Sequence, residues 1–248
     1  MSSSADRRLI VMIMVVVACG LALAVLSTSN RKPAASPPAP AASPAASGPA
    51  RTPSPQEEAL SQLARRKDGD PFAAGRPDAP VVLIEYADYQ CPFCGQFTRD
   101  IEPELIKRYV DAGTLRIEWR NFPIFGKESE AAARAAYAAG LQGRFRQFHR
   151  EVYSVDRKRN SGAFADDKLV AMAREADVPD LARFRRDLNS EAARDAVVAD
   201  QAEGTQIGVP STPAFLVNGR PILGAQPLET FVETIEQEAA KTAGTGTS

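Results

Sequence analysis

The pattern of apolar and polar positions divides the 248-residue chain into parts of different character. Residues 1–8 are polar. Leu9–Leu26 is an uncharged, mainly apolar run that is long enough to form one transmembrane helix. Residues 27–55 consist mostly of Ala, Pro and Ser, which cannot build a packed core and predict a disordered linker. Residues 56–240 have the mixed pattern of a globular domain, and 241–248 are expected to form a flexible tail.

The apolar run near the N-terminus has three interpretations. It is an uncleaved anchor, a signal peptide cleaved after Ala22-Leu23-Ala24, or a lipoprotein signal with lipid added at Cys19. The run continues past both processing sites, which favours the anchor. The arginines at positions 7 and 8 would then keep residues 1–8 in the cytoplasm. All three interpretations place the globular part outside the cytoplasm.

The first half of the globular part alternates strand and helix. Val81–Tyr86 is a continuous apolar run with one acid, typical of a buried strand, and a short edge strand is expected at Phe72-Ala73. A helix follows from Cys91 to about Val110, kinked at Pro103. Its apolar face repeats every four residues: Phe93, Phe97, Ile101, Leu105 and Tyr109. A second strand is predicted at Leu115–Phe122.

The second half begins with a long helical block, at about residues 128–207. N-caps are predicted at Asp166 or Asp167 and at Asp180. Strands Ala214–Val217 and Pro221–Leu223 then flank Asn218-Gly219, a strong hairpin signal, and a last helix starts at Pro227. This order predicts an α/β fold in which a βαβ half and a ββα half are separated by inserted helices.

The motif Cys91-Pro92-Phe93-Cys94 joins the buried strand to its helix and has the spacing of a redox-active pair. Cys91 would lie at the helix N-terminus, where free backbone N–H groups favour a thiolate, with Cys94 one turn away. A zinc site needs four ligands, and the chain adds just Cys19 and His149. A structural disulfide across two residues would close too small a loop to stabilise much. Thiol–disulfide exchange is therefore the favoured interpretation.

Charge and cysteine content agree with an exported protein that does not bind nucleic acid. The chain has 30 basic and 31 acidic residues, so no charge imbalance favours a polyanionic partner. The basic residues between 144 and 159 lack interleaved aromatic residues and indicate a solvated helix face. His149 is interpreted as a polar residue of an amphipathic helix. Beyond Cys19, the chain holds just Cys91 and Cys94, so no spare thiol can mispair in an oxidising compartment.

Two further residues stand out near the predicted strands. Pro213 precedes a hairpin strand, and the upstream cysteines favour a cis Thr212–Pro213 bond over an ordinary trans turn. Glu85 is an acid within a buried strand, where an unpaired charge is costly. It should therefore have a raised pKa or a partner; a salt-bridged or edge-exposed structural glutamate is the alternative.

Three segments, Glu85–Cys94, Thr212–Phe215 and Val217–Gly219, resemble the DsbA-type branch of the thioredoxin superfamily. The resemblance covers about residues 70–240 and implies an α/β, thioredoxin-like fold with an inserted α-helical domain. It also implies that Pro213 is a cis-proline beside the cysteines. By the same resemblance Thr212, with Pro92 and Phe93, contacts an extended substrate, and Glu85 handles the proton of Cys94.

One departure from the family pattern concerns the residues between the cysteines. Bacterial DsbA enzymes often carry a histidine there, which stabilises the thiolate by charge and hydrogen bonding; Phe93 can do neither. We therefore expect the backbone N–H groups of the helix terminus to be the main stabiliser of the Cys91 thiolate.

These inferences predict a monomeric, single-pass membrane enzyme without a cofactor, with an extracytoplasmic domain that introduces disulfides into cysteine-containing exported polypeptides. The resemblance implies re-oxidation by a quinone-linked membrane partner of the DsbB or VKOR kind. A disulfide reductase or isomerase of the same fold is an alternative. Isomerases of the superfamily generally add an N-terminal dimerisation domain, and here a linker precedes the fold. A redox-inactive, peptide-binding chaperone module is a second alternative.

Overall fold

The computed structural model describes residues 53–244. The expected membrane segment Leu9–Leu26, its processing sites and the linker up to residue 52 lie outside the described residues. Between residues 53 and 244 no helix combines the length and apolarity needed to cross a membrane. At the other end, the last helix continues to Gly244, so the expected flexible tail from residue 241 is helical over its first part.

Five strands form one mixed sheet in the order β1-β3-β2-β4-β5. The central strand β2 pairs in parallel with β3 and antiparallel with β4, while β1 lies at the edge, antiparallel to β3. The strands are β1 (Ala73–Ala74), β2 (Val81–Ala87), β3 (Leu115–Asn121), β4 (Ala214–Val217) and β5 (Arg220–Leu223). Every predicted strand is present, with ends displaced by one residue at most.

The helix after β2 is continuous but irregular. Its segments are α3 (Pro92–Gln96), η1 (Phe97–Ile101), α4 (Glu102–Leu105) and η2 (Ile106–Val110), of which the two η segments are π-helical. Pro103 has no N–H for the carbonyl of Arg99, and the turn before it widens so that the Glu102 N–H bonds to Phe97 O. Phe93 was expected on the buried face but is 59% exposed, whereas Cys94 and Gly95 of the same turn are buried.

The inserted block contains five helices. They are α5 (Lys127–Gly140), α6 (Phe145–Tyr153), α7 (Asp166–Glu175), α8 (Leu181–Leu188) and α9 (Glu191–Gln206). Asp180 caps α8 as predicted, accepting a 2.8 Å hydrogen bond from the Arg183 N–H. The predicted cap of α7 is wrong: its N-cap is Ala165, and both aspartates lie inside the first turn.

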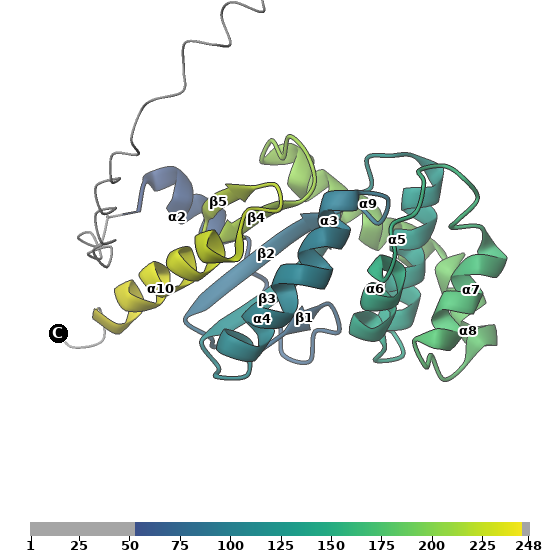
Figure 1. The fold of residues 1–248 in the computed structure, drawn as a ribbon, viewed down its shortest axis with the longest axis horizontal. Helices are drawn as coiled ribbons and strands as arrows, with labels where there is room; N and C mark the ends of the chain where they lie inside the picture. Colours follow the sequence, from purple (N-terminus) through teal and green to yellow (C-terminus); the bar gives the residue numbers. More distant parts are fainter. Residues whose placement is uncertain (1–52, 245–248) are drawn as a thin grey trace, which may run out of the picture. The chain divides into compact units, whose positions relative to one another are not determined.

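Alternate residues of β2 face two apolar layers. Leu83 faces the irregular helix and α10 (Leu228–Gly244), and Tyr86 faces the layer that includes α9. Figure 1 shows α4 and α10 on one face of the sheet, with α9 behind it. Phe97 lies 4.4 Å from Phe215 and 5.2 Å from Phe231, measured between ring centroids, so one aromatic cluster joins the irregular helix, β4 and α10.

The fold begins earlier than the sequence analysis predicts. Helix α2 spans Pro55–Ser61, and Ser54 and Glu57 form a capping box at its start. Leu60 of α2 and Leu63 just after it pack against the apolar layer on the Tyr86 face. Ser54 and Pro55, which were assigned to the disordered linker, therefore belong to the folded domain. The Ser-x-x-Glu spacing of a capping box was the signal available for this helix.

The centre of β3 holds a buried carboxylate whose charge is fully compensated. Glu118 accepts side-chain hydrogen bonds from Arg116 (2.8 Å) and Arg120 (2.9 Å), and backbone bonds from Arg65 and Arg66 after α2. Burial opposes the charge, but the hydrogen bonds from Arg116, Arg65 and Arg120 outweigh it and lower the pKa of Glu118 to about 2. This network fastens the segment after α2 to the sheet.

Replacing Glu118→Gln should lower the free energy of unfolding by about 3 kcal/mol at neutral pH, because two buried guanidinium groups lose a charged partner. The folded pKa lies below the unfolded value of about 4.3, so this contribution is present above that pH and disappears as pH falls to about 2. Urea unfolding at several pH values measures it. The control Glu104→Gln, in an exposed pair with Arg108, should change stability by less than about 0.5 kcal/mol. Equal effects of both variants would contradict the assignment.

Candidate functional site

The two cysteines lie where the central strand gives way to its helix. Cys91 is the N-cap of α3, and its backbone N–H donates to Asp88 O at 2.9 Å. Cys94 lies in the first helical turn, completely buried. Both are free thiols, so the structure represents the reduced form of the pair. A thiol at the open end of a helix, with a second thiol one turn away, is arranged to form and break a disulfide.

The segment before β4 completes this arrangement. Thr212–Pro213 is a cis peptide bond, as predicted. The Cys91 thiol donates to the Thr212 carbonyl oxygen at 3.2 Å, although the two residues are 121 positions apart. Tyr86 near the end of β2 pairs with Ala214 at the start of β4, and this register brings the two segments together.

The two thiols have opposite acid–base character. The hydrogen bond from the Cys94 thiol is the largest cause that lowers the pKa of Cys91 to about 6; Thr212 and the N–H groups of Phe93 and Cys94 add to it, and burial opposes it. Burial and the neighbouring Cys91 raise the pKa of Cys94 well above its ordinary value. The largest single stabiliser of the Cys91 thiolate is therefore the Cys94 side chain, and not a backbone N–H group as expected.

The remaining predicted site residues divide between surface and interior. Pro92 and Phe93 are exposed beside buried Cys91, so they form a small apolar surface around the reactive sulfur. Thr212 is 7% exposed, and within the described part of the chain its hydroxyl makes no hydrogen bond of good geometry, although it lies near enough to the Cys91 sulfur to help lower the pKa of that thiol. Glu85 is fully buried on β2, below the cysteines. The structure thus brings the cysteines, Thr212 and Pro213 together at one end of the sheet, with Glu85 beneath them.

Glu85 belongs to a buried group that the sequence analysis does not identify. A carboxylate oxygen of Glu85, one of Glu102 and a ring nitrogen of His149 all lie within 4.8 Å of one another. His149 is 2% exposed, so its assignment to a polar helix face is wrong: Phe145, Tyr89 and Trp119 enclose its ring. The signal was its position one turn after Phe145, on the apolar face of α6.

Within residues 53–244, Glu85, Glu102 and His149 are the group of side chains close enough together to be considered as ligands of a metal ion. Both ring nitrogens of His149 are already 3.2 Å from hydroxyl groups, those of Tyr89 and Thr98. The Trp119 indole N–H lies close enough to lower the pKa of both carboxyl groups, and a donor in that place repels a cation. The arrangement is better suited to exchanging protons than to binding a metal.

Asp88, in the loop before the cysteines, is a second residue that the sequence analysis missed. Its carboxylate accepts from the backbone N–H groups of Gln90, Ile124 and Phe125 and from the Ser129 hydroxyl, at 2.6–3.1 Å. The loop before Cys91 is thereby fastened to the start of the helical insertion. An acid placed directly after a buried strand and before the cysteine motif was the available signal.

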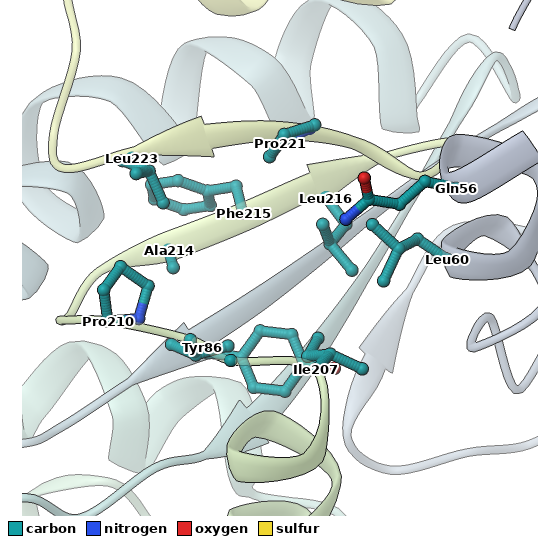
Figure 2. Close-up of a pocket in the computed structure, with 12 residues that line it drawn as sticks. Gln56, Leu60, Tyr86, Ile207, Pro210, Ala214, Phe215, Leu216, Pro221 and Leu223 are labelled. Atoms are coloured by element: carbon teal, nitrogen blue, oxygen red, sulfur yellow. The ribbon is translucent and has the colours of Figure 1, made fainter. Parts of the chain in front are cut away.

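An apolar cavity of about 230 Å³ lies on the other face of the sheet. Figure 2 shows Leu60 of α2, Ile207 and Leu216 around it, beside Tyr86. Tyr86 and Glu85 are adjacent on β2 and point to opposite faces, so the cavity does not open onto the cysteines. It lies between α2, the β4–β5 hairpin and the residues after α9.

Comparisons with known proteins agree with this geometry. A family model described as Thioredoxin matches residues 67–237. Probable disulfide bond formation protein D of Bacillus cereus is 29% identical over 171 residues, which cover 67% of this chain and 78% of that protein. The crystal structure of oxidised BdbD from Bacillus subtilis superposes with a TM-score of 0.64 and 26% identity, covering 68% of this chain and 92% of that one. Wolbachia pipientis alpha-DsbA1 has the same fold, with a TM-score of 0.66, 23% identity and coverage of 75% and 98%.

The chain therefore belongs to the thioredoxin family. Within that family its helical insertion and its relatives identify it as a thiol:disulfide oxidoreductase of the DsbA type.

The thiolate of Cys91 should be the reactive form at neutral pH. With a pKa of about 6, roughly nine-tenths of Cys91 is ionised at pH 7, against a few per cent of an ordinary thiol. The alkylation rate of the reduced protein should follow this titration, falling as pH drops through about 6. Thr212→Val should raise the midpoint while Ser211→Ala, at the exposed neighbour, leaves it unchanged. A midpoint near the ordinary thiol value would show that the site does not stabilise the thiolate.

Proposed function

We propose that this protein introduces disulfide bonds into exported polypeptides. In this proposal the sulfur of Cys91 reacts with the substrate, and Cys94 is its partner in the internal disulfide. The observation that carries the proposal is the placement of Cys91 at a helix N-terminus beside cis Thr212–Pro213, with the pKa of its thiol lowered to about 6. The relationship to a probable disulfide bond formation protein supports the same direction.

In the oxidising reaction, a substrate thiolate attacks Cys91 Sγ of the Cys91–Cys94 disulfide. One S–S bond forms between substrate and Cys91, the internal S–S bond breaks, and Cys94 leaves as a thiolate that takes up a proton. A second substrate thiolate then attacks the mixed disulfide. The substrate departs with its own disulfide, and Cys91 is released as the thiolate.

The lowered pKa of Cys91 supports this direction over reduction. A thiolate that is stable at neutral pH stabilises the reduced enzyme, which makes its disulfide a stronger oxidant. It also makes Cys91 a good leaving group in the final step. A disulfide reductase of the same fold would benefit from a less stabilised thiolate.

Exposed groups around Cys91 support binding of an extended polypeptide. Thr212 brings a backbone edge beside the sulfur, where a substrate strand can add by main-chain hydrogen bonds. Pro92 and Phe93 offer apolar contact on the other side, and Phe93 is 59% exposed. Contacts to backbone and to general apolar surface suit an enzyme that must accept many sequences.

The position of the enzyme in the cell is also part of the proposal. We assign residues 1–8 to the cytoplasm, Leu9–Leu26 to a membrane anchor, residues 27–53 to a linker and the domain from Ser54 to the outer side, as a monomer. A linker of about 25 residues in polyproline-like form reaches on the order of 75 Å. That reach would keep the domain near a quinone-linked re-oxidase in the same membrane.

A Cys94→Ser variant should accumulate mixed disulfides between Cys91 and exported proteins, because the internal thiol that would release them is missing. Non-reducing gels followed by mass spectrometry of the trapped species measure this. Cys91→Ser is the matched control and should trap nothing. If Cys91→Ser traps exported proteins instead, the roles of the two cysteines are reversed. If neither variant traps them, the assignment of roles is wrong.

The anchor is tested by the intact mass of the protein taken from native membranes. A mass that begins at Met1 or Ser2 supports the uncleaved anchor. A chain that begins at Cys19 with added lipid, or at Val25 in the soluble fraction, would falsify it. A protein lacking residues 1–52 should keep its exchange activity in vitro, because the described fold starts after them.

A further inference from the structure

Two buried carboxyl groups meet beneath the redox pair. Glu85 on β2 and Glu102 on α4 are 0% and 2% exposed, and one oxygen of each lies within 4.8 Å of the other and of the His149 ring. Across residues 53–244, neither oxygen of Glu85 nor Oε1 of Glu102 has a hydrogen-bond partner of good geometry. Two carboxylates this close and this deeply buried cannot both hold a negative charge, so the pair must hold at least one proton.

We propose that Glu102 shares this proton with Glu85 and relays protons between Glu85 and solvent during thiol–disulfide exchange. The relay rests on the proposed function, because it supplies the proton that Cys94 gains or loses. Glu102 acts through Glu85 and touches no substrate, so it is a positioning residue for proton transfer.

The relay follows from the position of each group. Glu85 interacts electrostatically with both cysteines and with Glu102. Glu102 interacts in turn with Arg146 and Arg150 of α6, of which Arg146 is half-buried and Arg150 is exposed. The groups that exchange the proton are therefore Cys94, Glu85 and Glu102, and Glu102 lies on the side facing the two arginines, where α6 reaches solvent.

Each proton transfer balances the sulfur chemistry. When a substrate thiolate breaks the internal disulfide, Cys94 becomes a buried thiolate and takes a proton from the Glu85 carboxyl. Glu85 is left as a carboxylate and takes a proton from Glu102, which takes one from water. One S–S bond breaks, one forms, and one proton passes from solvent to Cys94. Re-oxidation runs the same transfers in reverse.

The two carboxyl groups have the acid–base properties that this sequence requires. Burial raises the pKa of Glu85 well above its usual range, with Glu102 and Cys91 adding to the effect. Burial also raises the pKa of Glu102 to about 7, although Arg146 and Arg150 oppose it. Glu85 is thus a proton donor to a departing thiolate, and Glu102 is present in both forms near neutral pH.

The other groups facing the pair do not replace Glu102. They are Cys91 and Cys94 at the start of the irregular helix after β2, Tyr89 in the preceding loop, and Arg146, His149, Arg150 and Tyr153 on α6. Burial lowers the pKa of His149 to about 3, so it stays neutral and cannot compensate either carboxylate. The tyrosines have raised pKa values and stay protonated.

The test is a Glu102→Gln variant, which keeps the size of the side chain and removes its titration. The mixed disulfide of Cys91 with glutathione is formed, and the rate at which Cys94 expels glutathione is measured against pH. In the wild type this rate should follow a titration near pH 7. In Glu102→Gln it should fall about tenfold or more and lose that inflection. Glu102→Asp, which retains a carboxyl group, should restore the inflection.

Two controls separate the relay from a structural effect. Glu104→Gln, at an exposed position of the same helix, should leave the profile unchanged. The alkylation rate of Cys91, which does not need the Cys94 proton, should be the same in Glu102→Gln and wild type. Loss of Cys91 reactivity together with the Cys94 step would indicate a disturbed site and overturn the relay.

The outcomes distinguish the relay from the function on which it rests. A wild type that forms no mixed disulfide with glutathione overturns the proposed function and the relay together. A wild type that exchanges normally while Glu102→Gln keeps its pH profile overturns the relay alone. Carbon-13 NMR of labelled glutamates in the wild type gives a reading that does not depend on a variant folding. Coupled titration of Glu85 and Glu102 supports the relay, and no Glu102 titration between about pH 5 and about 9 overturns it.

Discussion

Antiparallel hydrogen bonds between β2 and β4 join two chain segments that meet at Cys91 and Thr212, 121 residues apart. Closing a flexible loop of that length costs about 4 kcal/mol in chain entropy. Burial of Phe97, Phe215 and Phe231 in one cluster contributes about 2–3 kcal/mol for each ring, which is enough to exceed that cost. The aromatic cluster lies directly below the redox helix, so the packing that closes the sheet also holds the helix N-terminus against the cis-proline segment.

The helical insertion contributes to the site as well as to the core. Asp88 fastens the loop before Cys91 to the segment that leads into α5, and the Tyr153 hydroxyl of α6 donates to the Asp88 carbonyl at 2.9 Å. Helix α6 also supplies His149 and the arginines that face Glu102. An insertion that contacts the redox loop from the side covers the buried acids, while the sulfur of Cys91 stays beside the exposed Pro92 and Phe93.

The buried carboxyl groups of this protein lie in two different electrostatic environments. Glu118 has four hydrogen-bond donors, including two guanidinium groups, and is held as an anion that joins the sheet to the segment after α2. Glu85 lies on the neighbouring strand with Glu102 and the His149 ring within 4.8 Å, and across residues 53–244 neither of its oxygens has a hydrogen-bond partner of good geometry. A compensated charge stabilises a fold, whereas an uncompensated one shifts its pKa and becomes able to exchange protons. The contrast supports reading Glu85 and Glu102 as functional groups.

The sequence by itself determined the strands, the position of the cysteine motif, the cis-proline and the hairpin, because these depend on local signals such as apolar runs, Asn-Gly turns and the spacing of two cysteines. Other features depend on contacts between segments that are far apart in the sequence, and only the tertiary structure determines them. Helix α2 has a capping box in its sequence, but its place in the fold comes from contacts with the sheet, and Phe93 is exposed although it continues the apolar repeat of its helix. The Cys91 thiolate is stabilised by Thr212, from a distant segment, as well as by Cys94 and the N–H groups of its own helix terminus. The meeting of Glu85, Glu102 and His149 requires three elements to pack together, and no spacing along the chain specifies that contact.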